Sequence, residues 1–270
     1  MNQPDTILTS IDARGVATVT LNNPEKHNAF DDVLIQALTQ SFEDIANNDD
    51  VRVMILASNG RSFSAGADLG WMKRMVNYSY DDNLQDAREL ARMLKTLAEM
   101  PQPTIAAVQG ATFGGAVGLV SCCDMALASE RAVFSLSEVR IGLIPATIGP
   151  YVVRAIGERA SRRYFMTGER FRANTAYHLG LVADVVAPED LDSAVQNEVN
   201  SILACGPQAV RAAKNLVNEI GGKAIDDKLI EYTCERIATI RASDEAQEGL
   251  GAFLEKRSPA WLQNEDDTNV

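Results

Sequence analysis

Positive charge is scarce in this sequence. Its 25 Lys and Arg residues stand against 37 Asp and Glu residues, which gives a formal net charge of −12 at pH 7. An excess of negative charge repels the phosphates of nucleic acids and the headgroups of anionic membranes. The composition therefore argues against a nucleic-acid partner, and any anionic ligand must be met locally by Lys, Arg or backbone N–H groups.

Residues that build metal and redox sites are also few. The chain has two His and four Cys, of which Cys122 and Cys123 are adjacent, and no CxxC spacing occurs. Two histidines cannot supply a zinc site made of several imidazoles, so we expect no metal. We expect the cysteines to be buried free thiols, as is usual in a reducing cytosol.

Long apolar runs are missing as well. No segment approaches the roughly 20 apolar residues that span a bilayer. The first ten residues, MNQPDTILTS, lack the basic and apolar regions of a signal peptide. We therefore expect a cytoplasmic protein that contacts no membrane. With 270 residues and 46% hydrophobic content, the chain is long enough to bury one sizeable core.

Strand and helix patterns alternate in the first half of the chain, which predicts parallel strands joined by helices. Expected strands cover 7–12, 16–21, 51–57, 104–108, 124–128 and 133–138, and expected helices cover 31–47, 83–99 and 115–123. The second half is mainly helical, with helices expected over 161–167, 173–179, 191–204, 207–220 and 226–240 and one strand over 181–186. Helical periodicity and capping residues carry these assignments.

Two glycine-rich turns, 65–68 and 113–116, each precede a helical pattern. Such a turn leaves backbone N–H groups free, with the helix dipole behind them. If the strands before the two turns are parallel neighbours, the turns lie side by side and two N–H groups can meet one oxygen. That arrangement is an oxyanion hole, in which each donor is worth about 2.7–4 kcal/mol in a well-studied hydrolase. Taken singly, each glycine is better explained by an ordinary turn or a close helix contact.

Four segments, in order and spacing, resemble the crotonase superfamily of enoyl-CoA hydratases and isomerases. They are FSAGADL (63–69), PTIAAVQGATFGGAVGL (103–119), CDMALASERAVFSLSEVRIGLIP (123–145) and AFLEKRSP (252–259). The resemblance runs from about residue 16 to 261. It implies an α/β fold, a spiral of ββα units over residues 1–200 that binds acyl-CoA, and a helical region over 201–270 used for trimerisation, often as a dimer of trimers.

The resemblance also implies which residues form the site. The oxyanion N–H groups would belong to Ala67 and Gly115, with Gly114 beside the substrate. No cofactor is implied, because coenzyme A is part of the substrate.

Binding of the coenzyme A portion is implied for two further groups of residues. The backbone around Ala65, Asp68 and Leu69 would meet the adenine end. Lys26, or a C-terminal basic residue such as Lys256, would meet the phosphates.

The carboxylates depart from the pattern of the family's hydratases, which typically place two glutamates around one water. The second glutamate is present as Glu138, and the position of the first is Gly118. Glu138 could both deprotonate water and return a proton. A second acid from Asp68, Asp124 or Glu158 is the alternative.

The expected function is hydration of a 2-enoyl-CoA. Gly118 and the neighbouring segments are most similar to hydratases of branched, carboxylated acyl-CoAs such as 3-methylglutaconyl-CoA or γ-carboxygeranoyl-CoA. Arg140 could pair with Glu138, bind a substrate carboxylate or form an ordinary surface ion pair. Two other functions stay open: a double-bond isomerase that uses one glutamate, and a non-catalytic acyl-CoA-binding scaffold.

Overall fold

The computed structural model describes residues 6–265, and the chain forms two compact units. The first unit consists of Met1–Met100 and Thr104–Gln196, and the second of Pro101–Pro103 and Asn197–Val270. The division at residue 200 expected from the sequence stays a prediction about domains.

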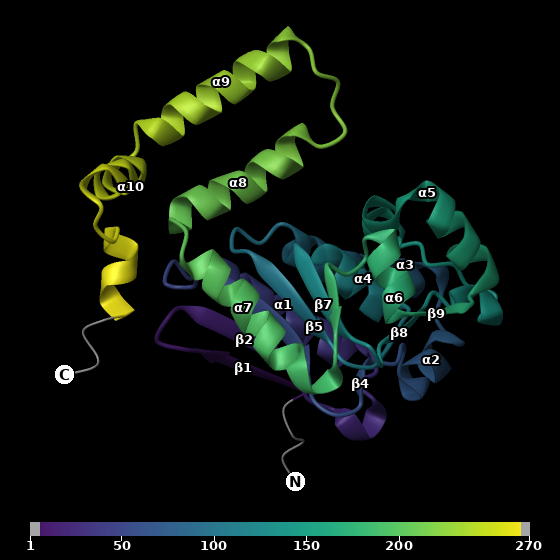
Figure 1. Cartoon of the computed structure of the whole chain (residues 1–270). Helices are drawn as coiled ribbons and strands as arrows, with labels where there is room; N and C mark the ends of the chain where they lie inside the picture. The colour runs from purple at the N-terminus through teal and green to yellow at the C-terminus, as the bar shows by residue number, and fades with distance from the viewer. Residues whose placement is uncertain (1–5, 266–270) are drawn as a thin grey trace. The chain divides into compact units, whose positions relative to one another are not determined.

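A six-stranded sheet forms the centre of the first unit (Figure 1). Across the sheet, its strands are β1 (Ile7–Ile11), β2 (Val16–Leu21), β3 (Val53–Ser58), β5 (Thr104–Val108), β7 (Met125–Ser129) and β10 (Asp184–Val186). Strand β1 pairs antiparallel with β2, and the remaining neighbours are parallel. Every residue of β5 is buried, as expected for a parallel strand covered on both faces.

A second, smaller sheet positions the two glycine turns. Its strands have three residues each: β4 (Ser62–Ser64), β6 (Ala111–Phe113), β8 (Val133–Ser135) and β9 (Arg170–Arg172). The pairs β4–β6 and β6–β8 are parallel, and β8–β9 is antiparallel. The 65–68 turn therefore follows one strand of this sheet, and the 113–116 turn follows its neighbour.

Helices pack around these sheets in the first unit. They are α1 (Asp32–Ala46), α2 (Leu69–Met75), α3 (Tyr80–Ala98), α4 (Gly115–Cys122), α5 (Gly149–Thr167) and α6 (Ala173–Leu179). Helix α1 packs on α3, α3 on α4, and α4 on α5. Helix α1 begins after Asp31, whose side chain accepts a hydrogen bond from the Leu34 N–H, as the polar cap before the apolar repeat predicts.

The second unit is helical. After α7 (Leu191–Leu203), which crosses the boundary between the units, it contains α8 (Pro207–Ile220), α9 (Asp227–Arg241) and α10 (Asp244–Glu255). Figure 1 shows the chain turning back after α8, so that α9 runs in the opposite direction. Within residues 6–265, no helix combines the length and the apolar character needed to cross a membrane.

Most of the expected helices and the strands of the large sheet are confirmed, but three expectations are wrong in extent and one helix was missed. The helix expected over 161–167 begins at Gly149 and contains a kink at Gly157. The strand expected over 181–186 covers only Asp184–Val186. The extended segment expected over 133–138 ends at Ser135, because Glu138 starts a short 3₁₀ helix, Glu138–Ile141. Helix α10 was not expected from the sequence.

Candidate functional site

The two glycine turns lie side by side at the ends of parallel neighbours, as the oxyanion-hole hypothesis requires. A Cβ atom built on Gly66 would lie 3.8 Å from the Phe113 Cβ. Gly66 has φ of +100° and Gly114 has φ of +56°, a region that L side chains rarely adopt. Glycine is therefore needed at both turns for the backbone path itself.

Phe30 holds the first turn in an extended conformation. Its N–H donates to the Gly66 carbonyl at 2.8 Å, and its carbonyl accepts from the Asp68 N–H at 2.7 Å. Successive residues of an extended chain point their N–H groups to opposite sides. The N–H of Ala67 therefore points away from Phe30, and no acceptor contacts it among residues 6–265.

Gly115 supplies the second N–H group. It is the first residue of α4, a position whose N–H has no partner inside the helix. The preceding Gly114 N–H is used, because it donates to the Ser135 carbonyl at 2.9 Å. A Cβ on Gly115 would lie 3.7 Å from the Phe30 ring. Phe30 thus contacts both turns, and the Ala67 and Gly115 N–H groups remain available to a ligand.

Glu138 lies beside the second turn. Its Oε1 would be 3.2 Å from a Cβ on Gly114, and its Oε2 is buried without a hydrogen-bond partner in the described part of the chain. Burial raises the pKa of this carboxyl above its ordinary value, since desolvation disfavours the charged form. A half-buried carboxylate with an unused oxygen is suited to take up and return a proton.

Gly118 marks the largest departure from a two-glutamate site. A Cβ at this position would lie 2.4 Å from Ile148 Cγ2 and 3.3 Å from Leu94 Cδ2. Side-chain atoms already fill the space into which a glutamate would extend. The chain therefore has no room for a second carboxylate at that position.

The three alternative acids are engaged elsewhere. Asp68 caps α2 by accepting from the N–H groups of Gly70 and Trp71, and Asp124 accepts from the N–H and the hydroxyl of Thr104. Glu158 pairs with Arg162 on the exposed surface of α5. Asp68 belongs to the first turn, but its carboxylate is held by the N–H groups at the start of α2, and the contacts of Asp124 and Glu158 lie away from both turns.

The residues predicted to bind coenzyme A surround the first turn in part. The Lys26 ammonium lies 3.3 Å from the Asp68 carboxylate, and the Ala65 N–H donates to the His27 carbonyl at 3.0 Å. Leu69, the first residue of α2, is 73% exposed. Their roles toward coenzyme A stay predictions.

Two further basic residues, Arg140 and Lys256, were predicted to bind the substrate. Arg140 is exposed and forms no ion pair within residues 6–265, and its side chain lies against Gly168. A pair with Glu138 is therefore absent from the structure. Lys256, which ends α10, belongs to the second unit.

Sequence reasoning missed Phe30 and Ile148, which shape the site without taking part in a chemical step. It also missed Asp86, which accepts a hydrogen bond of 3.0 Å from the buried Trp71 indole. Burial raises the pKa of Asp86 as well. Single apolar residues and a lone Asp carry no signal in one sequence, because many such residues serve only packing or solvation.

Two free N–H groups and one buried carboxyl suit a reaction that develops negative charge on an oxygen and moves a proton nearby. A thioester enolate has that charge distribution. Within the described residues, no group of three or more His, Cys, Asp or Glu side chains could hold a metal ion. The groups that the structure places at the two turns are N–H donors and a carboxyl group.

Comparisons with protein families and with solved structures point to the same family, and each covers nearly the whole chain. A family model described as enoyl-CoA hydratase/isomerase matches residues 12–264. An enoyl-CoA hydratase structure from Shewanella pealeana superimposes with a TM-score of 0.91 and is 47% identical, over 95% of this chain and 96% of that one. The crotonase fold expected from the sequence is thereby confirmed.

Relatives of different activities are similar to this chain at comparable levels. The 2,3-dehydroadipyl-CoA hydratase of Escherichia coli is 31% identical over 90% of this chain and 94% of its own length. The trans-2-decenoyl-[acyl-carrier-protein] isomerase of Streptococcus mutans is 29% identical over 94% and 97%. Overall similarity therefore does not separate hydration from isomerisation, and the site geometry has to be used.

Proposed function

Because the chain belongs to the enoyl-CoA hydratase/isomerase family, we propose that it adds water to the double bond of a 2-enoyl-CoA. The observation that carries this proposal is the position of Glu138. Its carboxyl group lies against Gly114, next to the free Gly115 N–H, and one of its oxygens has no partner among the described residues.

The two N–H groups act on the thioester carbonyl. In the proposed complex, the carbonyl oxygen accepts hydrogen bonds from Ala67 and Gly115. Electron density moves onto this oxygen as the nucleophile attacks, so the two hydrogen bonds strengthen on the way to the enolate. Their contribution to the rate arises because the donors are already oriented before the charge appears.

Glu138 handles the proton in both steps. It accepts a proton from water while the water oxygen bonds to the β-carbon, and the electrons of the double bond pass to the enolate. The protonated carboxyl then gives its proton to the α-carbon as the enolate collapses to the 3-hydroxyacyl thioester. One carboxyl group completes the cycle and ends in its starting form.

Isomerisation is the second candidate, and Gly118 favours it. Moving a double bond requires one base, which removes a proton from one carbon and returns it to another, and no water. Ile148 and Leu94 fill the place of a second carboxylate. The isomerase from Streptococcus mutans is a relative by sequence.

The proposed substrate class is a branched enoyl-CoA with a distal carboxylate, such as 3-methylglutaconyl-CoA. Arg140 supports it, because this exposed arginine two residues after Glu138 has no ion pair in the described part of the chain. The named substrate of the Escherichia coli relative, 2,3-dehydroadipyl-CoA, is also a carboxylated enoyl-CoA.

The remaining parts of the proposal concern cofactor, compartment and assembly. No cofactor is required, because coenzyme A arrives with the substrate. The four cysteines are free thiols, which suits a reducing compartment such as the cytoplasm, although Cys205 and Cys234 are exposed and not buried as expected. A homotrimer, or a dimer of trimers, is supported by α8 and α9, in which no side chain is buried.

The test is turnover in ¹⁸O water by wild type, Glu138→Gln and Glu158→Gln with a panel of enoyl-CoAs. Glu158→Gln is the matched control, because this glutamate is exposed and paired with Arg162. Hydration places one ¹⁸O on the β-carbon. We expect Glu138→Gln to lower kcat by roughly 10²–10⁴-fold, while the control keeps wild-type turnover.

Other outcomes point to the alternatives. A product with the substrate mass and a shifted double bond replaces hydration by isomerisation. Tight acyl-CoA binding without turnover of any thioester supports the scaffold function. For the substrate class, Arg140→Met should raise KM roughly tenfold for carboxylated substrates only, and an equal change for crotonyl-CoA would contradict the role of Arg140.

A further inference from the structure

Helix α2 follows directly on the turn that holds the Ala67 N–H group, but it is too short to be stable alone. It has seven residues, Leu69–Met75, and isolated helices of fewer than about 12 residues are marginal in water. Of these seven residues only Trp71 is buried, with 4% of its surface exposed. Leu69 and Val76, at the two ends, are 73% and 84% exposed. The position of α2 therefore depends on few contacts, and Trp71 makes the buried ones.

Trp71 connects the first turn to α3 through two hydrogen bonds. Its backbone N–H donates to the carboxylate of Asp68, the residue after Ala67, at 3.0 Å. Its indole N–H donates to the carboxylate of Asp86 on α3, also at 3.0 Å. An indole N–H can only donate, so Asp86 supplies the acceptor that a buried Trp requires. One residue thus joins the cap beside the first N–H donor to a helix of 19 residues.

Helix α3 supports the second donor as well. It packs on α4, whose first residue is Gly115. A Cβ atom on Gly118 of α4 would lie 3.3 Å from the Cδ2 atom of Leu94 on α3. Asp86 and Leu94 are separated by about 12 Å along a helix that rises 1.5 Å per residue. The two N–H donors are thus carried by elements that both contact α3.

The Asp86 carboxyl group lies where α1, α2 and α3 meet. Burial raises its pKa, and the hydrogen bond from Trp71 opposes that rise by favouring the ionised form. Asp32, the first residue of α1, raises the pKa further, and Arg74 of α2 lowers it. Arg74 also pairs with Asp32, but both side chains are about half exposed, and such surface pairs contribute little. The bond between Trp71 and Asp86 is therefore the stronger anchor of α2.

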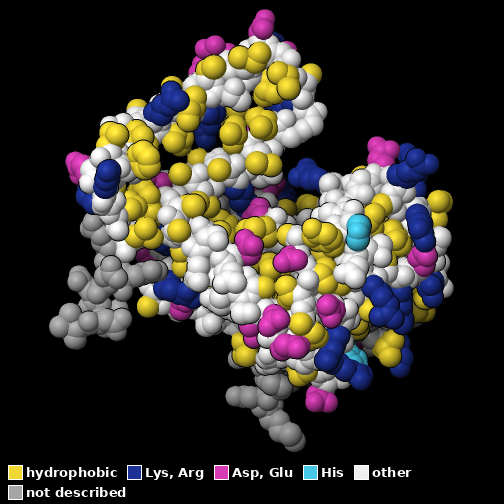
Figure 2. Space-filling model, in the orientation of Figure 1, with side chains coloured by type: hydrophobic (Ala, Val, Ile, Leu, Met, Phe, Trp, Pro, Cys, Tyr) yellow, Lys and Arg dark blue, Asp and Glu magenta, His cyan; other side chains and the backbone are white. Residues whose placement is uncertain are grey.

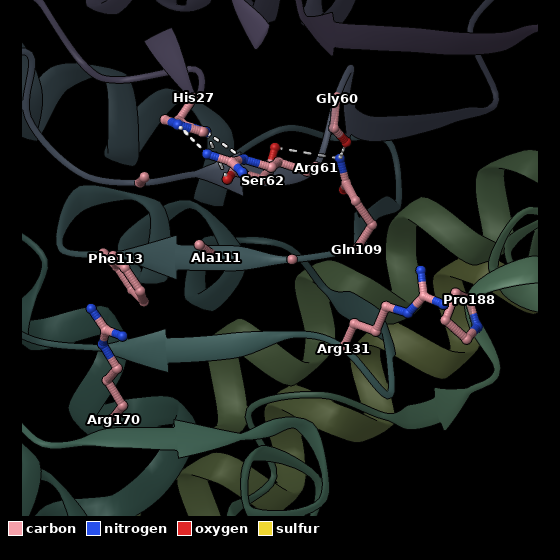
Figure 3. Close-up of a pocket in the computed structure, with 12 residues that line it drawn as sticks. His27, Gly60, Arg61, Ser62, Gln109, Ala111, Phe113, Arg131, Arg170 and Pro188 are labelled. Atoms are coloured by element: carbon pink, nitrogen blue, oxygen red, sulfur yellow. Dashed lines mark hydrogen bonds between the residues drawn. The ribbon is translucent and has the colours of Figure 1, made fainter. Parts of the chain in front are cut away.

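Neither Trp71 nor Asp86 lines the cavity that opens beside the two turns. This cavity of about 540 Å³ is lined by Ala65 of the first turn and Phe113 of the second, and Figure 3 shows the Phe113 side chain at its wall. Trp71 and Asp86 are absent from its lining. Trp71 is also buried, so it offers little surface to a ligand. An effect of these two residues on the reaction would therefore pass through the backbone of the first turn.

We propose that the hydrogen bond between Trp71 and Asp86 is a positioning contact of the reaction. It holds α2 against α3, so that the Ala67 N–H is directed at the same oxygen as the Gly115 N–H. This inference rests on the proposed use of these two groups as an oxyanion hole. A donor contributes to the rate when it is oriented before charge appears on the oxygen. Loss of the bond should therefore affect the transition state more than the bound ground state.

Three variants of the full chain test this proposal. Trp71→Phe keeps an aromatic ring in the core and removes the N–H donor, Asp86→Ala removes the acceptor, and Asp86→Asn keeps an acceptor oxygen. The matched control is Trp261→Phe, which removes the indole N–H that donates to the Ala204 carbonyl in the second unit. Turnover of crotonyl-CoA is measured at a temperature where thermal unfolding shows every variant to be folded.

We expect Trp71→Phe and Asp86→Ala each to lower kcat by roughly 10-fold to 100-fold with little change in KM, because one donor is misplaced and not removed. The double variant should be no slower than the slower single variant, since both changes break the same bond. Asp86→Asn should retain most of the wild-type kcat, and Trp261→Phe all of it. An unchanged kcat in Trp71→Phe overturns the proposal. A rise in KM at constant kcat also overturns it, because Trp71 would then contact the substrate.

A second readout separates this inference from the proposed hydration. Butyryl-CoA has no double bond to hydrate, and hydrogen bonds lower the stretching frequency of its thioester carbonyl. Difference infrared spectroscopy of the bound thioester should show a lowered frequency in wild type and a smaller effect in Trp71→Phe. If wild type hydrates no enoyl-CoA and this difference is still observed, hydration fails and the positioning role stands. An equal frequency in the two proteins overturns the positioning role, whatever the turnover.

Discussion

At the scale of single residues, Glu138 combines two properties that conflict energetically. Its carboxyl group is largely buried and one oxygen has no partner among residues 6–265, which disfavours the ionised form. The proposed reaction requires that ionised form as a base. The folded protein therefore gives up some stability at this position, and activity and stability should respond to pH in opposite directions.

The destabilising effect of ionised Glu138 can be measured as a pH-dependent change in Tm. Because burial raises the folded pKa of Glu138, its ionisation destabilises the fold as pH rises from the unfolded pKa through the folded one. We expect Glu138→Gln to have a higher Tm than wild type near neutral pH, and the difference to vanish below about pH 4. Thermal unfolding over a pH series measures it. Glu158→Gln, at an exposed glutamate, should show no such gain, and an equal gain there would refute the explanation.

Gly118 can be tested in the same way. A Cβ at 118 would overlap Ile148, so Gly118→Ala should destabilise the fold by about 1–3 kcal/mol through overpacking. Ile148→Ala should cost about 2–5 kcal/mol alone. The double variant should be more stable than the sum of the two predicts, because each change relieves the other. Urea unfolding of all four proteins measures this coupling, and strict additivity would contradict the contact.

At the scale of elements, the start of α2 places the first N–H group of the site. Asp68 caps this helix directly after Ala67, and the hydrogen bond from the Trp71 N–H holds the pKa of Asp68 below its ordinary value. This stabilisation is present above the unfolded pKa and is lost as pH falls through the folded pKa. A weaker cap should loosen both the helix and the turn before it.

The corresponding variants are Asp68→Ala and Asp68→Asn. The alanine removes both cap hydrogen bonds and should cost about 1 kcal/mol, with a loss of kcat because the Ala67 N–H is less well held. The asparagine keeps an oxygen acceptor and should retain most of both. Urea unfolding and turnover of an enoyl-CoA are the readouts. If the two variants lose kcat equally, the charge facing Lys26 matters more than the cap.

Elements also differ in how well the sequence predicts them. The longer buried strands and the long amphipathic helices show a clear period of apolar residues over five or more positions. Those that were predicted from this period are present in the structure. The small sheet was missed as a sheet, because β4, β6, β8 and β9 have three residues each and no pattern that exceeds chance. The glycine turns were found through their residues. The contacts of Phe30 with these turns, and of Ile148 with Gly118, join segments that are distant in the sequence, and a single sequence does not show which distant segments pair.

At the scale of the whole molecule, the helices of the second unit carry large apolar side chains that are exposed. Val217 on α8 is 67% exposed, and Phe253 on α10 is 80% exposed. Figure 2 shows hydrophobic side chains gathered along these helices. Exposed apolar surface of this kind usually marks a contact between proteins. A second copy of the same chain is the partner that the proposed trimer supplies.

The purified protein should therefore have three or six times the mass of one chain by sedimentation equilibrium. Val217→Lys/Phe253→Lys should shift the population to smaller species, because each charge would be buried without a partner in the assembly. Leu8→Lys, on the edge strand β1 of the first unit, is the control and should leave the mass unchanged. A wild-type monomer would contradict the trimer, and an equal shift by the control would move the contact to the first unit.

Since Glu138 and the N–H groups all belong to the first unit, turnover by a dissociated variant would further show that one chain completes the site.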